Sequence, residues 1–282
     1  IANETIFEDE TFEIAVSGND VDLDDVISFS ASVDGNASAS VDGTSLTVVP
    51  DLNYSGSIQV TVTATDIDGE TGQASFTLSV LAVNDAPVAD AIDDQETDED
   101  QAFEIALSAS DVDGDDLSFS ASVDGNALVS VDGTTLSVVP DLNYSGDIAV
   151  TVVVSDGQYT SSSTFTLTVN PVNDGPVLLL DLNNLIFNED DPISSIDLSI
   201  HFSDVDNNLT YNIEYDLEFL ETSVSENILN LNFIENQNGI GDVTVIASDG
   251  LLSAQDTFSL TVLPVNDAPV ADAIDDQETD ED

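Results

Sequence analysis

A short motif that recurs at almost constant spacing sets the size of the folding unit in this chain. Asn-Asp-Ala-Pro-Val at 84–88 returns as Asn-Asp-Gly-Pro-Val at 173–177 and as Asn-Asp-Ala-Pro-Val at 266–270, with spacings of 89 and 93 residues. A period of this length is that of a domain rather than of a solenoid unit. We expect three repeats, the third divergent, and then the linker and first strand of a fourth: 1–83, 84–172, 173–265 and 266–282.

The beginning of the fourth repeat copies that of the second. Residues 265–282 are identical to residues 83–100. The chain starts at Ile1 with no initiator Met or signal segment, so we expect it to be part of a longer protein. The link between repeats contains Pro and has no Gly/Ser spacer, which restricts the relative orientation of neighbouring domains.

Within a repeat the pattern is that of β-strands. Apolar and polar residues alternate at 57–64 and at 74–80, where Val, Thr and Phe are frequent. Asp-Gly pairs at 34–35, 42–43, 124–125 and 132–133 separate such runs, and Asp-Gly is the signal for a type I′ hairpin. The Cys and Trp signature of antibody domains is absent. We expect an all-β fold of tandem immunoglobulin-like β-sandwich domains in an elongated array.

The side chains of this sequence carry negative charge almost exclusively. The chain has 58 Asp and Glu residues, no Lys or Arg, and one His. Two carboxylates about 5 Å apart repel by ~3 kcal/mol at an effective dielectric constant of about 20. No cationic side chain can relieve this repulsion, so the counter-charge comes from solution. Because 41% of the residues are hydrophobic, we expect a folded protein rather than a disordered acidic tail.

These features exclude several functions. A polyanion lacks the Lys and Arg that bind nucleic acid or anionic lipid, and no apolar run is long enough to insert into a membrane. We expect no enzyme: His201 is the only imidazole, no Gly-x-Ser-x-Gly elbow occurs, and the acidic pairs recur with the domain. Tyr54 and Tyr144 recur at one repeat position, so we expect them to be packing residues.

Carboxylates gather at matching places in each repeat. The pair Glu-Asp stands at 8–9, 99–100, 189–190 and 281–282, Asp-x-Asp stands at 20–22, 111–113 and 204–206, and a late Asp stands at 66, 156 and 249. Asp residues that only form turns are the alternative, which we favour for the Asp-Gly hairpins. Many hard oxygen ligands without His or Cys favour Ca²⁺ over zinc, copper or Mg²⁺.

The ordered set of motifs resembles cadherin-type domains, and closely the bacterial cadherin-like tandem repeats of large secreted surface adhesins and extracellular filaments. The resemblance rests on Glu8, on Asp-Val-Asp at 111–113, on Ala-Thr-Asp at 64–66 and on the Asn-Asp-Ala-Pro link at 84–87, and it covers the whole chain. It implies Ca²⁺ at the junctions between domains. The implied ligands of the first junction are Glu8, Asn84, Asp85, Asp111, Asp113 and Asp156. Those of the second junction are Glu99, Asn173, Asp174, Asp204, Asp206 and Asp249.

The link departs from the full cadherin pattern, which has Asp-x-Asn-Asp-Asn, and the Asp-Arg-Glu motif is absent. We therefore expect one or two ions at each junction rather than three.

Together these features predict a calcium-rigidified structural or adhesive segment of an extracellular protein, secreted or on a bacterial cell surface. Its expected partners are neighbouring copies of the repeat. A variant of this prediction, beside one long chain, is a filament of many chains assembled by exchange of the terminal strand at 266–282. One alternative is a carbohydrate- or protein-binding module that uses loops of the third repeat, where Tyr211 and Tyr215 are the candidate aromatic residues. Another is an accessory domain of an enzyme.

Overall fold

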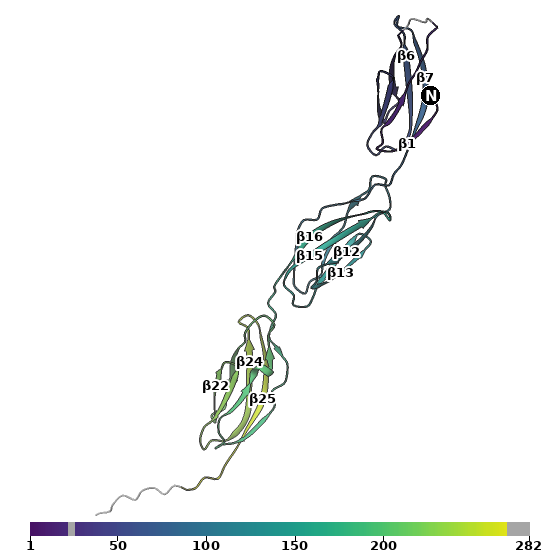
Figure 1. Ribbon diagram of the computed structural model, residues 1–282. Coiled ribbons are helices and arrows are strands. Elements are labelled where there is room, and N and C mark those ends of the chain that lie inside the picture. The colour runs from purple at the N-terminus through teal and green to yellow at the C-terminus, as the bar shows by residue number, and fades with distance from the viewer. Residues whose placement is uncertain (22–25, 270–282) are drawn as a thin grey trace, which may run out of the picture. The chain divides into compact units, whose positions relative to one another are not determined.

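The computed structural model describes residues 1–21 and 26–269 (Figure 1), and the described chain is almost entirely β-structure. The expected all-β fold is confirmed, and the one helix among these residues is the short 3-10 helix η1 (Leu198–Ile200). No helix in this part of the chain has the length and apolar character needed to cross a membrane. The first strand expected for a fourth repeat, within 270–282, lies outside the described residues.

Seven strands form in the described part of residues 1–83. They are β1 (Glu4–Phe7), β2 (Phe12–Ala15), β3 (Ser28–Val33), β4 (Ala37–Asp42), β5 (Ser45–Pro50), β6 (Gly56–Thr65) and β7 (Thr71–Leu81). One sheet has the order β1-β7-β6-β3 and the other has the order β2-β5-β4. β1 runs parallel to β7, whereas the other neighbours are antiparallel.

The next segment repeats this plan and adds two short strands. Its strands are β8 (Val88–Ala89), β9 (Gln95–Asp98), β10 (Phe103–Ala106), β11 (Ala109–Ser110), β12 (Ser118–Val123), β13 (Ala127–Asp132), β14 (Thr135–Pro140), β15 (Gly146–Ser155) and β16 (Thr160–Asn170). The sheets are β12-β15-β16-β9 and β10-β14-β13, and β8 pairs with β11.

The third segment has the same order of strands. They are β17 (Val177–Leu178), β18 (Leu185–Asn188), β19 (Ser194–Asp197), β20 (Phe202–Ser203), β21 (Thr210–Tyr215), β22 (Leu220–Ser225), β23 (Ile228–Phe233), β24 (Gly239–Ser248) and β25 (Ser253–Leu263). The sheets are β18-β25-β24-β21 and β19-β23-β22, and β17 pairs with β20. By contacts between residues the chain forms two compact units, Ile1–Asn170 and Pro171–Asp282.

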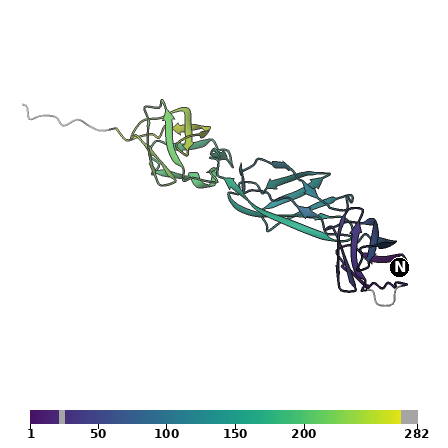
Figure 2. The same cartoon turned by 90° about the horizontal axis from the view of Figure 1, so that it is seen from above.

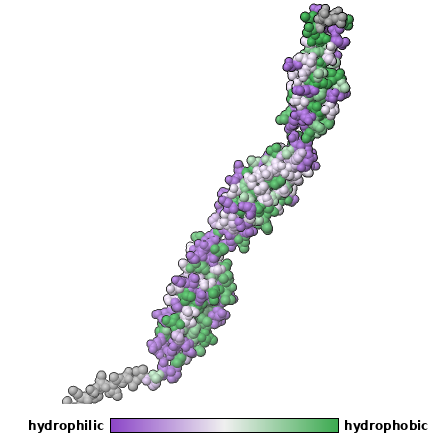
Figure 3. Space-filling model, viewed as in Figure 1, coloured by the Kyte–Doolittle hydropathy of each residue, from purple (hydrophilic) through white to green (hydrophobic). Residues whose placement is uncertain are grey.

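Alternation along the strands places one set of side chains in each core. In β15 the residues Ile148, Val150, Val152 and Val154 are buried, whereas their neighbours are more exposed. Figure 2 shows the strands of Figure 1 from a second direction. Figure 3 shows hydrophobic and hydrophilic residues intermingled on the visible surface. Three separate hydrophobic clusters form, one in each group of strands just described.

The turn between β4 and β5 differs from the expected type, whereas the two repeated tyrosines pack as expected. Gly43 and Thr44 connect β4 to β5, and only the glycine has a positive φ, of 61°. The expected type I′ turn is therefore wrong here, because that turn requires a positive φ at both central residues. Tyr54 and Tyr144 pack against their cores, as expected, and their hydroxyls donate to the carbonyls of Ser57 and Asp147 at 3.2 and 3.0 Å.

Leu136→Ala should lower the free energy of unfolding by about 2–5 kcal/mol, because Leu136 is fully buried and the truncation leaves a cavity. Leu128→Ala on the neighbouring strand is the matched control, since Leu128 is 74% exposed and should change stability by less than about 0.5 kcal/mol. Urea denaturation of both variants measures this difference. Equal effects would contradict the assigned register of β13 and β14.

Candidate metal centre

Glu8 is the carboxylate that joins the first strand of repeat 1 to the link that follows the repeat. It comes directly after β1, is only 5% exposed, and its backbone N–H donates to Leu81 O at 2.9 Å. Its Oε1 accepts a hydrogen bond from the backbone N–H of Val83 at 2.5 Å. Because β1 runs parallel to β7, the ends of both strands meet here, and Glu8 reaches the link over a separation of 75 residues.

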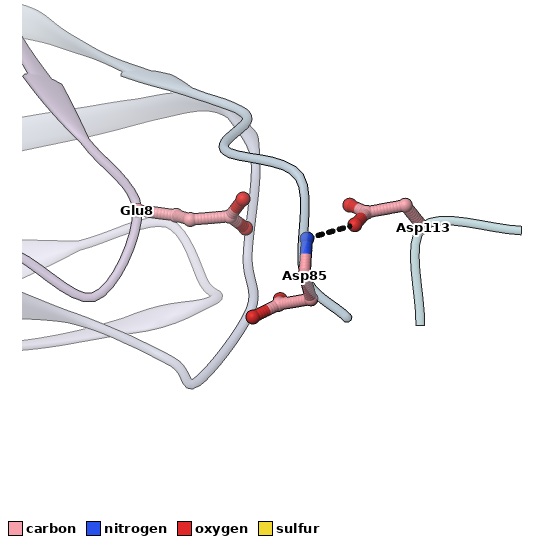
Figure 4. Close-up of side chains that lie close together, drawn as sticks. All are labelled: Glu8, Asp85 and Asp113. Carbon is pink, nitrogen blue, oxygen red and sulfur yellow. Dashed lines mark hydrogen bonds between the residues drawn. The ribbon is translucent and has the colours of Figure 1, made fainter. Parts of the chain in front are cut away.

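The link is also bound to repeat 2. The side-chain amide of Asn84 donates to Asp85 O at 2.9 Å and to Asp156 Oδ2 at 2.8 Å. The backbone N–H of Asp85 donates to Asp113 Oδ2 at 2.8 Å, as Figure 4 shows. One carboxylate from each repeat thus accepts a hydrogen bond from a backbone N–H of the link, at Val83 and at Asp85.

Asp111 shapes the loop that presents Asp113. Its Oδ1 accepts hydrogen bonds from the backbone N–H groups of Asp113, Gly114 and Asp115, at 2.9, 3.2 and 3.4 Å. Gly114 has a φ of 79°, a left-handed conformation that glycine adopts without strain. A side-chain carboxylate that accepts from the following backbone is the local hydrogen bonding that makes Asp frequent in such turns.

Two groups of carboxylates converge at this junction. Ligand atoms of Glu8, Asp85 and Asp113 all lie within 4.8 Å of one another, and the same holds for Asp111, Asp113 and Asp115. Figure 4 shows Glu8 and Asp113 approaching the link from opposite sides, with Asp85 between them. Asp113 belongs to both groups, so the two groups are neighbours.

Two oxygens in these groups are buried without a hydrogen bond among the described residues. They are Oδ2 of Asp85 and Oδ2 of Asp111. A buried polar atom with no partner is costly, and such atoms commonly mark the place of an ion or a water molecule. A divalent cation is a suitable partner, because the sequence contains no Lys or Arg to supply positive charge.

The pKa values of the site reflect this crowding. Burial from solvent raises the pKa of Asp85, and the charges of Asp113 and Glu8 raise it further. Burial also raises the pKa of Asp115, as do the charges of Asp111 and Asp113. For Asp156 burial acts in the same direction, but hydrogen bonds from Asn84, Tyr159 and Gln158 outweigh it and lower the pKa.

Sequence reasoning overlooked Asp115. It stands two residues after Asp113, as Asp113 stands two residues after Asp111. The Asp-x-Asp pattern thus continues for one more step in repeat 2, and that continuation is the signal that could have identified Asp115. In repeat 3 the corresponding position is Asn208.

The second unit contains five of the six residues expected for the second junction. The side-chain amide of Asn173 donates to Asp174 O and to Asp249 Oδ2, both at 2.8 Å, and the N–H of Asp174 donates to Asp206 Oδ2 at 2.9 Å. Asp204 Oδ1 accepts from the N–H of Asp206 at 2.9 Å. These bonds match those of Asn84, Asp85, Asp111, Asp113 and Asp156 one for one.

Two electrostatic features of these residues repeat those of Asp156 and Asp111 at the first junction. The side-chain hydrogen bond from Asn173 lowers the pKa of Asp249, and backbone hydrogen bonds lower it further. Asp204 Oδ2 is buried without a hydrogen bond among the described residues. Glu99, the sixth expected residue, is 4% exposed and belongs to the first unit, so its place beside the other five stays a prediction.

A third acidic residue repeats the arrangement of Glu8. Glu189 is 5% exposed, and its carboxylate accepts from the backbone N–H of Val265 at 2.7 Å and from the side chain of Asn238 at 2.9 Å. The hydrogen bonds from Asn238 and Val265 lower its pKa. The side-chain amide of Asn266 donates to Asp267 O, as that of Asn84 does to Asp85 O.

Several solved structures are similar to this chain, and two of those named here have TM-scores above 0.5. The chain is 18% identical to mouse cadherin-23 repeats EC22-24 with a TM-score of 0.56, over 93% of this chain and 96% of that one. It is 17% identical to the extracellular cadherin domains 1-5 of protocadherin gamma B2, also with a TM-score of 0.56, over 94% and 59%. It spans 61% of the human desmocollin-1 ectodomain, at 16% identity over 95% of this chain and a TM-score of 0.44.

A search of curated proteins found no match. Residues 1–79 and 84–170 each match the family described as bacterial Ig domain. The two matches cover more than half of the chain and correspond to its first two sandwiches. The chain therefore belongs to the bacterial Ig domain family, in a tandem arrangement whose fold is that of cadherin and immunoglobulin repeats.

Proposed function

We propose that this chain is a structural or adhesive segment of an extracellular bacterial protein, and that Ca²⁺ binds at the junctions between its repeats. The observation that carries the proposal is the convergence of Glu8, Asp85 and Asp113 within 4.8 Å. These residues come from the end of the first strand of repeat 1, from the link and from a loop of repeat 2. A cation held by them is bound to both repeats at once.

The residues of the first junction divide into two roles. Glu8, Asp85, Asp111 and Asp113 would hold the ion, because their carboxylates crowd together and two of their oxygens are buried without a hydrogen bond among the described residues. Asn84 and Asp156 position the link through their mutual hydrogen bond of 2.8 Å. Calcium would supply the positive charge that the chain itself lacks.

The direction of the effect follows from electrostatics. Without a cation, carboxylates of repeat 1, the link and repeat 2 repel one another, and the repulsion favours separation of the repeats. With a cation, each carboxylate is attracted to a shared charge, and separation of the repeats breaks ligand bonds. Extracellular modules bind Ca²⁺ with dissociation constants of about 10⁻⁴–10⁻³ M, which suits a calcium-dependent junction outside the cell.

Membership of the bacterial Ig family and the cadherin-like fold support a structural role outside the cell. No specific observation favours the alternative of a binding module in the third repeat. Tyr211 packs edge-on against Phe202 with ring centroids 6.1 Å apart, and the Tyr215 hydroxyl accepts from the N–H of Thr222 at 3.2 Å. Both candidate aromatic residues thus have contacts within the repeat.

Asp111→Asn combined with Asp113→Asn should abolish Ca²⁺ binding at the first junction, because both changes remove ligand charge and keep the side-chain shape. Isothermal titration calorimetry of the full chain should then lose the ions of that junction and keep the others. Asp132→Asn is the control, since Asp132 ends the hairpin strand β13 and belongs to neither group of converging carboxylates. Unchanged stoichiometry in the double variant would mean that the two aspartates only form a turn.

Removal of Ca²⁺ should loosen the junctions more than the individual sandwiches. Small-angle scattering should show that the maximum dimension of the chain changes on addition of EDTA and recovers with excess Ca²⁺. The thermal midpoint should rise with Ca²⁺ concentration, by the equivalent of about 2.7 kcal/mol at one hundred times the dissociation constant. Indifference of both quantities to EDTA would refute the calcium proposal.

Asp115→Asn should have opposite effects with and without Ca²⁺. In EDTA at pH 7 the variant should be more stable, because the raised pKa of Asp115 means that its ionised form opposes folding. This advantage should shrink as the pH falls through the raised pKa, where the wild-type carboxylate becomes protonated. In millimolar Ca²⁺ the variant should bind the ion more weakly, because Asp115 converges with the two ligands Asp111 and Asp113 and its charge adds to theirs.

Thermal melts from pH 7 to pH 4 in both media measure the effect of Asp115→Asn, with Asp132→Asn as the control. A variant that is less stable than the wild type in EDTA would show that Asp115 is a structural hydrogen-bonding residue rather than a repelled charge.

A further inference from the structure

Repeats 2 and 3 hold the link with the same hydrogen bonds, but they differ in the loop that carries the Asp-x-Asp motif. In repeat 2 four residues, Gly-Asp-Asp-Leu at 114–117, lead from Asp113 to β12. In repeat 3 three residues, Asn-Asn-Leu at 207–209, lead from Asp206 to β21. Two carboxylates of the first loop are therefore replaced by two side-chain amides in the second.

The first of these amides, that of Asn207, binds the link. Its Nδ2 donates a hydrogen bond to Asn173 Oδ1 at 2.9 Å. Asp204 Oδ1 accepts from the backbone N–H of Asn207 at 2.7 Å, so the carboxylate that shapes the loop also positions this side chain. The Nδ2 of Asn173 in turn donates to Asp174 O and to Asp249 Oδ2. Both ends of the Asn173 side-chain amide are thus bound by the protein itself.

The loop of repeat 2 cannot form this bond to Asn84, which stands where repeat 3 has Asn173. Gly114 has no side chain, and the carboxylates of Asp115 and Asp116 accept hydrogen bonds but do not donate them when ionised. The Oδ1 of Asn84 therefore receives no hydrogen bond from the side chains at these positions.

The carboxylate of Asp115 is instead repelled by its surroundings. Burial raises its pKa, and the charges of Asp111, Asp113 and Asp156 raise it further. Asp111, Asp113 and Asp115 converge within 4.8 Å, whereas no three carboxylates of the described part of repeat 3 do so. The loop of repeat 2 thus requires a counter-charge, and the loop of repeat 3 has an amide in its place.

We propose that Asn207 ties the Asp-x-Asp loop of repeat 3 to its link without a cation, whereas the same contact in repeat 2 depends on Ca²⁺. The dependence of repeat 2 on Ca²⁺ rests on the proposed function, and the tie through Asn207 is independent of it. Removal of Ca²⁺ then loosens the loop of repeat 2 from its link and leaves the loop of repeat 3 attached. The two links of the chain therefore differ in their response to calcium.

A matched pair of backbone N–H groups reports on the two contacts. The N–H of Asp85 donates to Asp113 Oδ2 at 2.8 Å, and that of Asp174 donates to Asp206 Oδ2 at 2.9 Å. Both Asp85 and Asp174 follow an asparagine, so their intrinsic rates of hydrogen exchange are nearly equal. A difference between their measured rates therefore reflects how firmly each loop holds its link.

NMR measurement of solvent exchange on the full chain in EDTA should show that the N–H of Asp174 exchanges at least about threefold more slowly than that of Asp85. Excess Ca²⁺ should slow exchange at Asp85 by a larger factor than at Asp174. Asn207→Ala should remove the difference in EDTA, because the loop then loses its hydrogen bond to the link. Asn208→Ala is the matched control, since Asn208 is exposed and makes no side-chain hydrogen bond to the link among the described residues.

Asn207→Asp gives the loop of repeat 3 the acidic character of the loop of repeat 2. In EDTA a carboxylate oxygen then faces Asn173 Oδ1 in place of the donor, and its charge adds to those of Asp204 and Asp206. Exchange at Asp174 should therefore be faster than in the wild type, and excess Ca²⁺ should slow it by a larger factor than in the wild type. A variant that responds to Ca²⁺ as the wild type does would contradict the role assigned to the amide.

Equal exchange at Asp85 and Asp174 in EDTA would overturn the inference even if Ca²⁺ binds, and so would slow exchange at Asp174 that persists in Asn207→Ala. An equal effect of Asn208→Ala would also overturn it, because the effect would then not depend on the bond to Asn173. If Ca²⁺ changes exchange at neither group, the calcium proposal fails together with the dependence of repeat 2 on the ion. The tie through Asn207 is then decided by the rates in EDTA alone.

Discussion

The repulsion between carboxylates that have no cationic side chain to pair with is the constraint on which the rest of this structure depends. Uncharged N–H and O–H donors must compensate them, and among the described residues the fold directs many backbone N–H groups at carboxylates. Asp9 accepts from Asn53, Asp34 from Gln59, and Asp94 from Thr166, in each case through the backbone N–H. The carboxylates thus fasten turns and strand ends to one another across long separations in sequence.

At the junctions, hydrogen bonds from backbone N–H groups compensate the negative charge of the carboxylates only in part. Val83 and Asp85 of the first link each donate a backbone N–H to a carboxylate, one from repeat 1 and one from repeat 2. The remaining oxygens crowd together, and their negative charges raise the pKa of Asp85 beyond the effect of burial. The backbone positions the site, and the uncompensated charge makes it receptive to a cation. Positioning and binding are therefore separate properties of the same few residues.

The fold could be predicted from the sequence because period-2 alternation and the domain-sized repeat are local or directly countable signals. The bonds from Asn84 to Asp156 and from Asp85 to Asp113 agree with the motif order, whose residues lie far apart in sequence. The burial of Glu8 was not predictable, because it depends on how the link folds back onto the end of the first strand, whereas the continued Asp-x-Asp pattern could have identified Asp115.

A crystal structure of the chain grown with millimolar calcium, with diffraction recorded at a wavelength that gives calcium a strong anomalous signal, tests the central claim most directly. The account predicts an anomalous peak between Glu8, Asp85 and Asp113, with oxygen distances of about 2.3–2.6 Å. Well-ordered side chains at this junction without an anomalous peak would contradict it, because the crowded carboxylates would then be stable without the ion.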